Sequence, residues 1–146
     1  MDRGVAVVLT AIAGGLVAMQ APINSKLGKA AGTFAAASIS FLIGTAILVA
    51  ITALSGWKVN LATAGKLPWY YLTGGLLGAA YVTTVLVSVR TLGAGGVTAA
   101  TIAGQLSTAV VLDRLGAFGL PEKSITVGRL VGVVLLAAGV FLVVRE

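Results

Sequence analysis

The sequence predicts an all-α integral membrane protein with five transmembrane helices. Of its 146 residues, 58% are hydrophobic and only 10% are charged, and the mean hydropathy is +1.07. A soluble domain carries about 25% charged residues, so a surface this apolar indicates lipid as the solvent. In addition, apolar runs of about 20 residues, the length that crosses a bilayer, recur along the chain between short polar segments. The length suits one transmembrane domain over residues 1–146.

The five apolar runs give the expected spans. The first is longer than the hydrophobic core of a cleaved signal peptide, so we expect a permanent span that a polar link at residues 25–29 closes. Pro68 suits the first turn of the third span, where its missing N–H costs nothing. The glycine-rich stretch 93–96 is expected to be a flexible link before the fourth span. The predicted spans are residues 4–24, 33–54, 68–89, 97–112 and 125–144.

The composition excludes several classes of function. The chain has no Cys and no His, which removes disulfides, thiol chemistry and the commonest metal ligand. Its acidic residues are Asp2, Asp113, Glu122 and Glu146. None of them has the His, Cys or second carboxylate that a catalytic set needs, so we expect no enzyme, no metal site and no cofactor. The ten Lys and Arg are spread along the chain, which argues against a nucleic-acid partner.

Aromatic residues gather between the second and third predicted spans: Trp57, Trp69, Tyr70 and Tyr71. Amphipathic rings favour the headgroup level of a bilayer, so an interface belt is one interpretation. The other is an aromatic wall for a substrate cation, and Trp69 is then a candidate for the lining of a solute path.

Two pairs of glycines have the spacing that places both members on one helix face. They are Gly74 with Gly78 and Gly128 with Gly132. Helices in lipid associate by close backbone approach, which glycine permits. Packing within one subunit is the default interpretation, and a subunit interface is the alternative for the second pair.

Polar residues inside the apolar runs are the candidate site. Gln20 and Asn24 lie four residues apart, on one helix face. Pro22 between them removes a backbone hydrogen bond to the carbonyl of Ala18 and is expected to kink the helix, leaving a carbonyl for side chains, water or solute. The alternative is that the helix ends there and Asn24 caps the next segment. Ser40, in the second span, is a weaker candidate for the lining.

A second set of polar residues lies in the fourth span. Gln105 is near its middle, where an amide needs partners, so it is either a pathway residue or a structural hydrogen bond between helices. Asp113 lies two turns further on, beside Arg114 at the helix end. These two residues are candidates for a surface or interface ion pair, or for coupling to an ion.

The order and spacing of short motifs resemble the YdcZ-type branch of the drug/metabolite transporter superfamily over nearly the whole chain. The motifs are Gln20-Ala21-Pro22-Ile23-Asn24, Ser40-Phe41-Leu42-Ile43-Gly44-Thr45, Trp69 with Gly74-Gly75-Leu76-Leu77-Gly78-Ala79, Arg90-Thr91-Leu92-Gly93-Ala94, Gly104-Gln105, Leu112-Asp113-Arg114-Leu115-Gly116 and Arg129-Leu130-Val131-Gly132.

The resemblance implies a multi-pass protein of the bacterial inner membrane whose five-helix unit works in antiparallel pairs. The pair is one self-pairing protein, two paralogues or a fused ten-helix chain. The family tends to place His after the Asp, where this chain has Arg114, so a titrating Asp–His pair is not carried over. The related small multidrug exporters use a Glu in the first helix, and the first span here has no acidic residue.

These observations favour a transporter or facilitator of a small polar or amphiphilic solute that works by alternating access. The alternative is a membrane assembly or accessory subunit that needs a paralogous partner. In the five-span arrangement, six basic residues lie on one side and four on the other, too small a bias to fix one orientation. We therefore expect an antiparallel homodimer inserted both ways. The two sets are Arg3, Lys58, Lys66, Arg114, Lys123 and Arg129 against Lys26, Lys29, Arg90 and Arg145.

Overall fold

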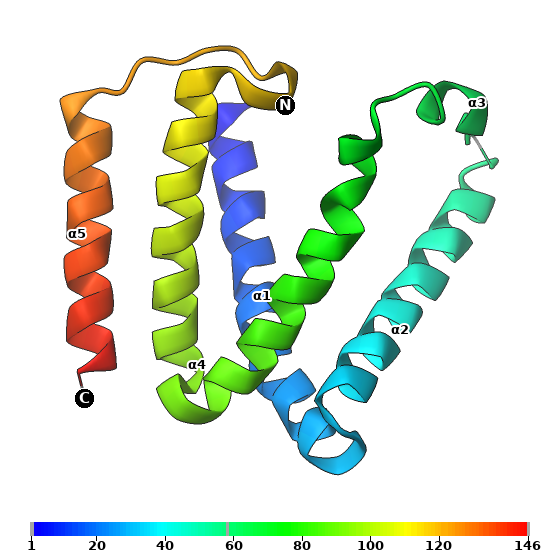
Figure 1. The fold of residues 1–146 in the computed structure, drawn as a ribbon, viewed down its shortest axis with the longest axis horizontal. Helices are drawn as coiled ribbons and strands as arrows, with labels where there is room; N and C mark the ends of the chain where they lie inside the picture. Colours follow the sequence, from blue (N-terminus) through cyan, green and yellow to red (C-terminus); the bar gives the residue numbers. More distant parts are fainter. Residues whose placement is uncertain (1, 58, 146) are drawn as a thin grey trace. The chain divides into compact units, whose positions relative to one another are not determined.

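The computed structural model describes residues 2–57 and 59–145, and this part of the chain is helical with no strand (Figure 1). Lys58 and Glu146, which entered the charge arguments above, lie outside the described residues. The elements in chain order are α1 (Arg3–Ala31), α2 (Thr33–Leu54), α3 (Leu61–Ala64), the 3₁₀ turn η1 (Trp69–Thr73), α4 (Gly74–Leu115), the 3₁₀ turn η2 (Ala117–Gly119) and α5 (Val127–Val144).

Four helical stretches in the described residues are long and apolar enough to cross a membrane. They are α1, α2, the continuous run Trp69–Leu115 and α5. Large apolar side chains point outward along all of them, for example Leu54 at 88% exposure and Val127 at 77%. Outward-facing apolar side chains suit a lipid solvent, so the predicted all-α membrane class is confirmed.

The chain divides into two compact units, and the boundary falls inside α4. The N-terminal unit, residues 1–90, holds α1, α2 and the first part of α4. The C-terminal unit, residues 91–146, holds the second part of α4 and α5.

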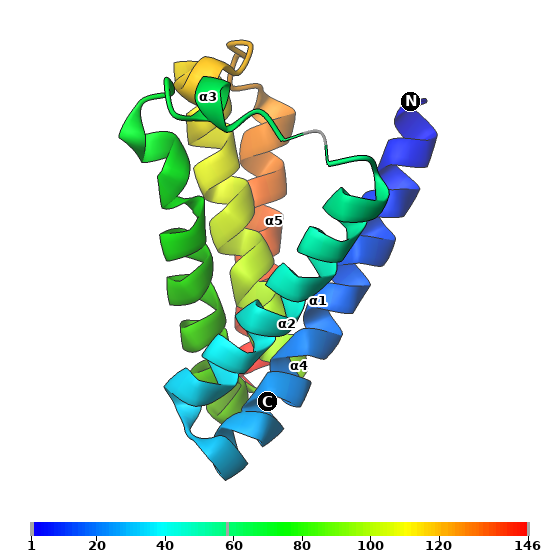
Figure 2. The ribbon, with the colours of Figure 1, turned by 90° about the vertical axis from the view of Figure 1, so that its right-hand side faces the viewer.

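The polar link expected at residues 25–29 is wrong, because α1 continues through it to Ala31. Ser25 is buried at 6% exposure, and lysine is a good helix former whose long side chain reaches water from a helix end. Gly32 is where α1 stops. Its φ of +93° is a conformation that favours glycine, and its N–H donates to the carbonyl of Gly28 over 3.0 Å. The chain then enters α2, which packs beside α1 (Figure 2).

The flexible link expected at residues 93–96 is also wrong in extent, because only Gly93 departs from helical geometry, with φ of +67° and ψ of 172°. Gly95 and Gly96 continue the helix. A Cβ added at Gly96 would lie 3.4 Å from the Cγ2 of Val144 on α5, and one at Gly95 would lie 3.9 Å from Val143. These two glycines therefore allow the second part of α4 to approach α5 closely.

Two helix starts also differ from the predicted positions. Pro68 lies outside the α-helix and precedes η1, with an extended ψ of 140° that leads the chain into the 3₁₀ turn. The last helix begins at Val127, because Thr126 is extended and its hydroxyl accepts from the N–H of Arg129 over 3.3 Å. Such a side-chain cap satisfies one of the free N–H groups of the first helical turn.

Candidate functional site

Asn24 is the polar centre of the N-terminal unit. It is only 5% exposed, and its Oδ1 accepts a hydrogen bond of 2.6 Å from the hydroxyl of Ser40 on α2. The buried residues of these two helices are otherwise small, Ala21, Ala36 and Ala37 among them. Small side chains let helix backbones approach in a membrane, where a polar pair then links them. The structure thus brings Asn24 and Ser40 together, and Asn24 does not end α1.

A small pocket lies beside Asn24, between α1 and the first part of α4. Its volume of about 10 Å³ is close to the space that one water molecule needs. The polar members of its lining are Gln20, Asn24 and Tyr81. Three neutral hydrogen-bonding groups around one cavity can hold a water molecule or a polar group of a solute. The lining residues are Val17, Gln20, Ala21, Asn24, Tyr81, Val82, Val85 and Leu86.

Pro22 lies inside α1, and the helix continues on both sides of it. Its ring nitrogen cannot donate to the carbonyl of Ala18. That carbonyl belongs to the turn that also carries Val17 and Ala21, both in the pocket lining. An acceptor without its usual backbone donor therefore lies on the same helical turn as two lining residues.

Arg90 is a residue that the sequence reasoning placed only at the end of a span and in a family motif. Its Nε donates to the hydroxyl of Ser25 and its Nη2 to the hydroxyl of Thr33, each over 3.4 Å. A Cβ added at Gly28 would lie 2.9 Å from the Cδ2 of Leu86 and 3.0 Å from the Nη2 of Arg90. The glycine therefore gives two side chains of α4 room against α1.

Gln105 belongs to the C-terminal unit, on the second part of α4, where it is exposed. Its side chain makes no hydrogen bond to another described residue, whereas the Ser107 hydroxyl donates to the carbonyl of Ala103 over 2.8 Å. A cavity that Gln105 shares with Gln20 or Asn24 would join the two units and stays a prediction.

Asp113 and Arg114 both form ion pairs, although not with each other. The Oδ2 of Asp113 lies 3.1 Å from the Nη2 of Arg129 and 3.7 Å from the Nζ of Lys123. Arg114 pairs with Glu122. The backbone N–H of Lys123 also donates to the carbonyl of Asp113 over 2.8 Å. These contacts hold the connection between α4 and α5 against the end of α4.

The aromatic candidate lies outside the pocket lining. Trp69 is 76% exposed and makes an edge contact with Tyr70, with ring centroids 6.4 Å apart. Tyr70 and Tyr71 also contact each other at 4.7 Å. An exposed aromatic cluster at the start of a span suits the interface belt.

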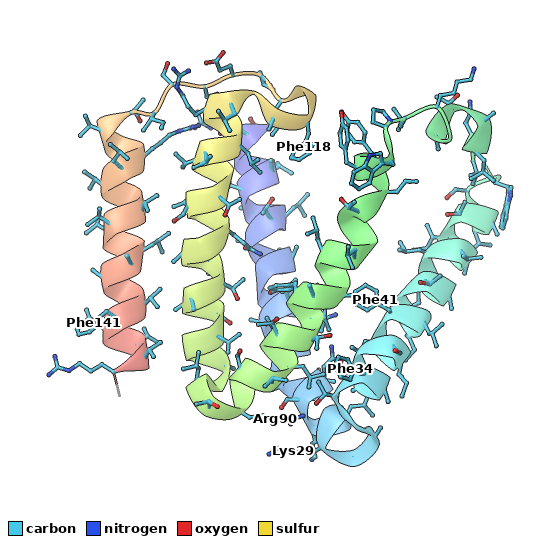
Figure 3. All side chains as sticks on the ribbon, viewed as in Figure 1. Lys29, Phe34, Phe41, Arg90, Phe118 and Phe141 are labelled. Carbon is cyan, nitrogen blue, oxygen red and sulfur yellow. The ribbon has the colours of Figure 1, made fainter. Side chains whose placement is uncertain are left out.

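The predicted glycine faces differ in what they meet. A Cβ at Gly78 would lie 3.3 Å from the ring of Phe41 on α2, whose side chain is labelled in Figure 3. Gly74 and Gly132 face open space, and the nearest atom to Gly128 is the hydroxyl of Thr126 at 4.0 Å. Among the described residues, the second pair therefore leaves a face of α5 uncovered.

Known proteins resemble this chain over most of its length. The family model described as "Putative inner membrane exporter, YdcZ" matches residues 5–142. The chain is 30% identical over 112 residues to the inner membrane protein YdcZ of Escherichia coli strain K12, and the aligned part covers 74% of this chain and 72% of that protein. No solved structure matches the chain.

Proposed function

We propose that this chain, which belongs to the YdcZ family of inner membrane exporters, is a transporter. It carries a small polar or amphiphilic solute, and Gln20, Asn24 and Tyr81 supply the hydrogen bonds. The observation that supports this most is the buried Asn24, which lines the pocket and accepts a hydrogen bond from Ser40, in a chain that otherwise presents mainly apolar surface to its surroundings. Polar groups inside a membrane bundle are expensive, and those that face a cavity are typical of solute paths.

The transporter has five spans, because α4 crosses the membrane twice. Its 42 residues would extend roughly 63 Å as one helix at 1.5 Å per residue, against a hydrocarbon core of about 30 Å. The non-helical backbone of Gly93 divides these residues into two parts of spanning length. An odd number of spans places the two chain ends on opposite sides of the membrane.

Two copies in opposite orientations form the working unit. Five helices cannot supply an inverted repeat within one chain, so a pseudo-two-fold solute site needs a second chain turned over. The open face at Gly128 and Gly132 on α5 suits a contact between copies, because glycines permit close helix approach in lipid. The alternative is a fixed orientation with a paralogous partner.

During transport, the solute takes the place of a protein partner of Asn24. Its pocket now has room for about one water molecule, so the helices that line it must separate to admit a solute. A donor group of the solute then bonds to the Oδ1 of Asn24 in place of the Ser40 hydroxyl. Alternate opening toward each side of the bilayer completes the cycle.

Flux into vesicles tests this function. Proteoliposomes are challenged with gradients of small neutral, anionic and cationic solutes, and the light scattering of the vesicles follows entry. We expect protein-dependent flux for at least one solute, and loss of most of it in Asn24→Leu. The control is Thr10→Val, which removes a hydroxyl that bonds only to the carbonyl of Ala6 in its own helix.

The accessory-subunit alternative makes a different prediction for the same assay. A subunit without transport of its own gives no flux for any solute, although the protein is folded in the vesicles. Flux that appears only when a paralogue is reconstituted with it would favour the heteromeric form. Equal flux in wild type and Asn24→Leu would remove the pocket from the path.

A further inference from the structure

We propose that Arg90, with the two hydroxyls that hold it, forms a binding site for a phosphate group at the end of the N-terminal unit where α1 joins α2. The phosphate belongs to the headgroup of an anionic phospholipid. The site does not depend on the transport function, because it lies beyond the pocket-lining residues on both helices.

The guanidinium of Arg90 has hydroxyl partners but no carboxylate among the described residues. By contrast, two other arginines form ion pairs with carboxylates, Arg114 with Glu122 and Arg129 with Asp113. In the sequence no acidic residue occurs between Asp2 and Asp113. Asp2 caps the opposite end of α1. No carboxylate of the described residues therefore neutralises Arg90, and an anion from outside the protein can do so.

Arg90 is exposed, and hydroxyls from two helices contact its guanidinium. Ser25, which accepts from Nε, is only 6% exposed, so this hydroxyl is anchored in the helix contact. Thr33, at the start of α2, accepts from Nη2. Gly28 leaves the space that a Cβ would take from the same nitrogen. Because an arginine has five N–H donors, the two that contact the hydroxyls leave others for a ligand.

Two lysines add charge at the same end. Lys26 and Lys29 lie exposed on the last turns of α1, and Figure 3 places Lys29 and Arg90 at the same end of the helices. Cations on the last turns of α1 and at Arg90, with no acidic residue between Asp2 and Asp113 in the sequence, make this end of the unit attractive to an anion.

A phosphate fits the site better than other anions that meet a membrane protein. The planar guanidinium matches a phosphate through two parallel hydrogen bonds, and such charge-assisted bonds are the strong ones. Helix ends lie at the level of the lipid headgroups, where basic pockets between membrane helices bind anionic lipids. A phosphate that is free in water has the same chemistry, so the experiment must separate these two sources.

Lipid binding to the purified full-length protein in mixed micelles tests the proposal. Native mass spectrometry counts bound phosphatidylglycerol across a titration, with zwitterionic phosphatidylcholine as the comparison lipid. We expect Arg90→Gln to weaken phosphatidylglycerol binding by roughly tenfold or more, the effect of losing a charge-assisted hydrogen bond. The matched control is Arg145→Gln, which removes the same charge at a helix end. The guanidinium of Arg145 lies 5.9 Å from the ring centroid of Phe141 and contacts no hydroxyl among the described residues.

Equal weakening in both variants, or none in Arg90→Gln, would overturn the site, since binding would then follow total charge or ignore Arg90. Inorganic phosphate added to the micelles separates the sources: displacement of the lipid at millimolar phosphate assigns the site to soluble phosphates, and no displacement assigns it to the headgroup. If Arg90→Gln does not fold, Arg90→Lys keeps the charge but loses the fork and is expected to bind several-fold more weakly. Wild-type binding by a folded Arg90→Lys would refute the guanidinium geometry.

Discussion

The hydrogen bond between Ser40 and Asn24 should stabilise the contact of α1 with α2 by a measurable amount. Its length of 2.6 Å and the 5% exposure of Asn24 describe a well-formed bond whose acceptor is buried. Ser40→Ala leaves a buried amide oxygen without its donor, which costs about 1–3 kcal/mol in soluble proteins. Pairs in membrane proteins couple more weakly, about 0.6 kcal/mol on average and about 1.7 at most. Because this bond is short and its acceptor residue Asn24 is buried, we expect the coupling free energy to lie in the upper half of that range.

A double-mutant cycle measures this coupling. The free energy of unfolding is determined by denaturant titration in mixed micelles for wild type, Ser40→Ala, Asn24→Ala and the double variant. The control cycle pairs Asn24→Ala with Thr10→Ala, 14 residues earlier on α1 and so about 21 Å away at 1.5 Å per residue, whose hydroxyl donates to the carbonyl of Ala6 in its own helix. Distant sites add within about 0.3–0.5 kcal/mol. A coupling for Ser40 and Asn24 inside that margin would refute the reasoning, since the bond would then link nothing in the folded protein.

Further predictions concern packing, charge, pathway and topology. Gly28→Val should lower stability by about 1–3 kcal/mol in the same titration, because its side chain meets Leu86 and Arg90, whereas Gly44→Ala, with open space around it, should not. Asp113→Asn should cost less than about 1 kcal/mol, since the side chains of Asp113, Arg129 and Lys123 all stay partly exposed, at 25%, 30% and 54%, and it should leave vesicle flux intact; abolished flux would favour a coupling role. Gln105→Leu should reduce flux in a protein that stays folded and dimeric, and unchanged flux with lower stability would assign the amide to structure. A single cysteine near Asp2 should be labelled in about half the molecules from each side of the membrane, and labelling from one side alone would favour a paralogous partner.

The sequence predicted well those features that depend on local composition. Apolar runs of spanning length identified the membrane class, and the motif order identified the family, which the family match confirms. The exact helix ends were less predictable. Ser25 was assigned to a link because it is polar, yet packing buries it in the helix. Composition alone could not reveal that contact, because it is made by residues far along the chain.

The polar residues at and beside the pocket were likewise predictable only in part. Gln20 and Asn24 could be selected because amides are conspicuous in an apolar helix, and Ser40 because of its motif. Tyr81 was missed, although a phenol in the middle of a predicted span carries a hydroxyl that needs a partner. An amide and a phenol within an apolar span give the same indication, because each is a polar group that needs a hydrogen-bond partner inside the bundle.

Arg90 was missed for a different reason. A cation at the end of a span serves equally well as a topology signal, so its position in the sequence carries no sign of a site. What distinguishes it is three-dimensional: hydroxyls from α1 and α2 converge on one guanidinium, and Gly28 leaves it room. Arg145 has the same place at a span end and none of these contacts with hydroxyls. A span-end arginine therefore becomes a candidate binding residue only when other helices hold its guanidinium and no carboxylate neutralises it.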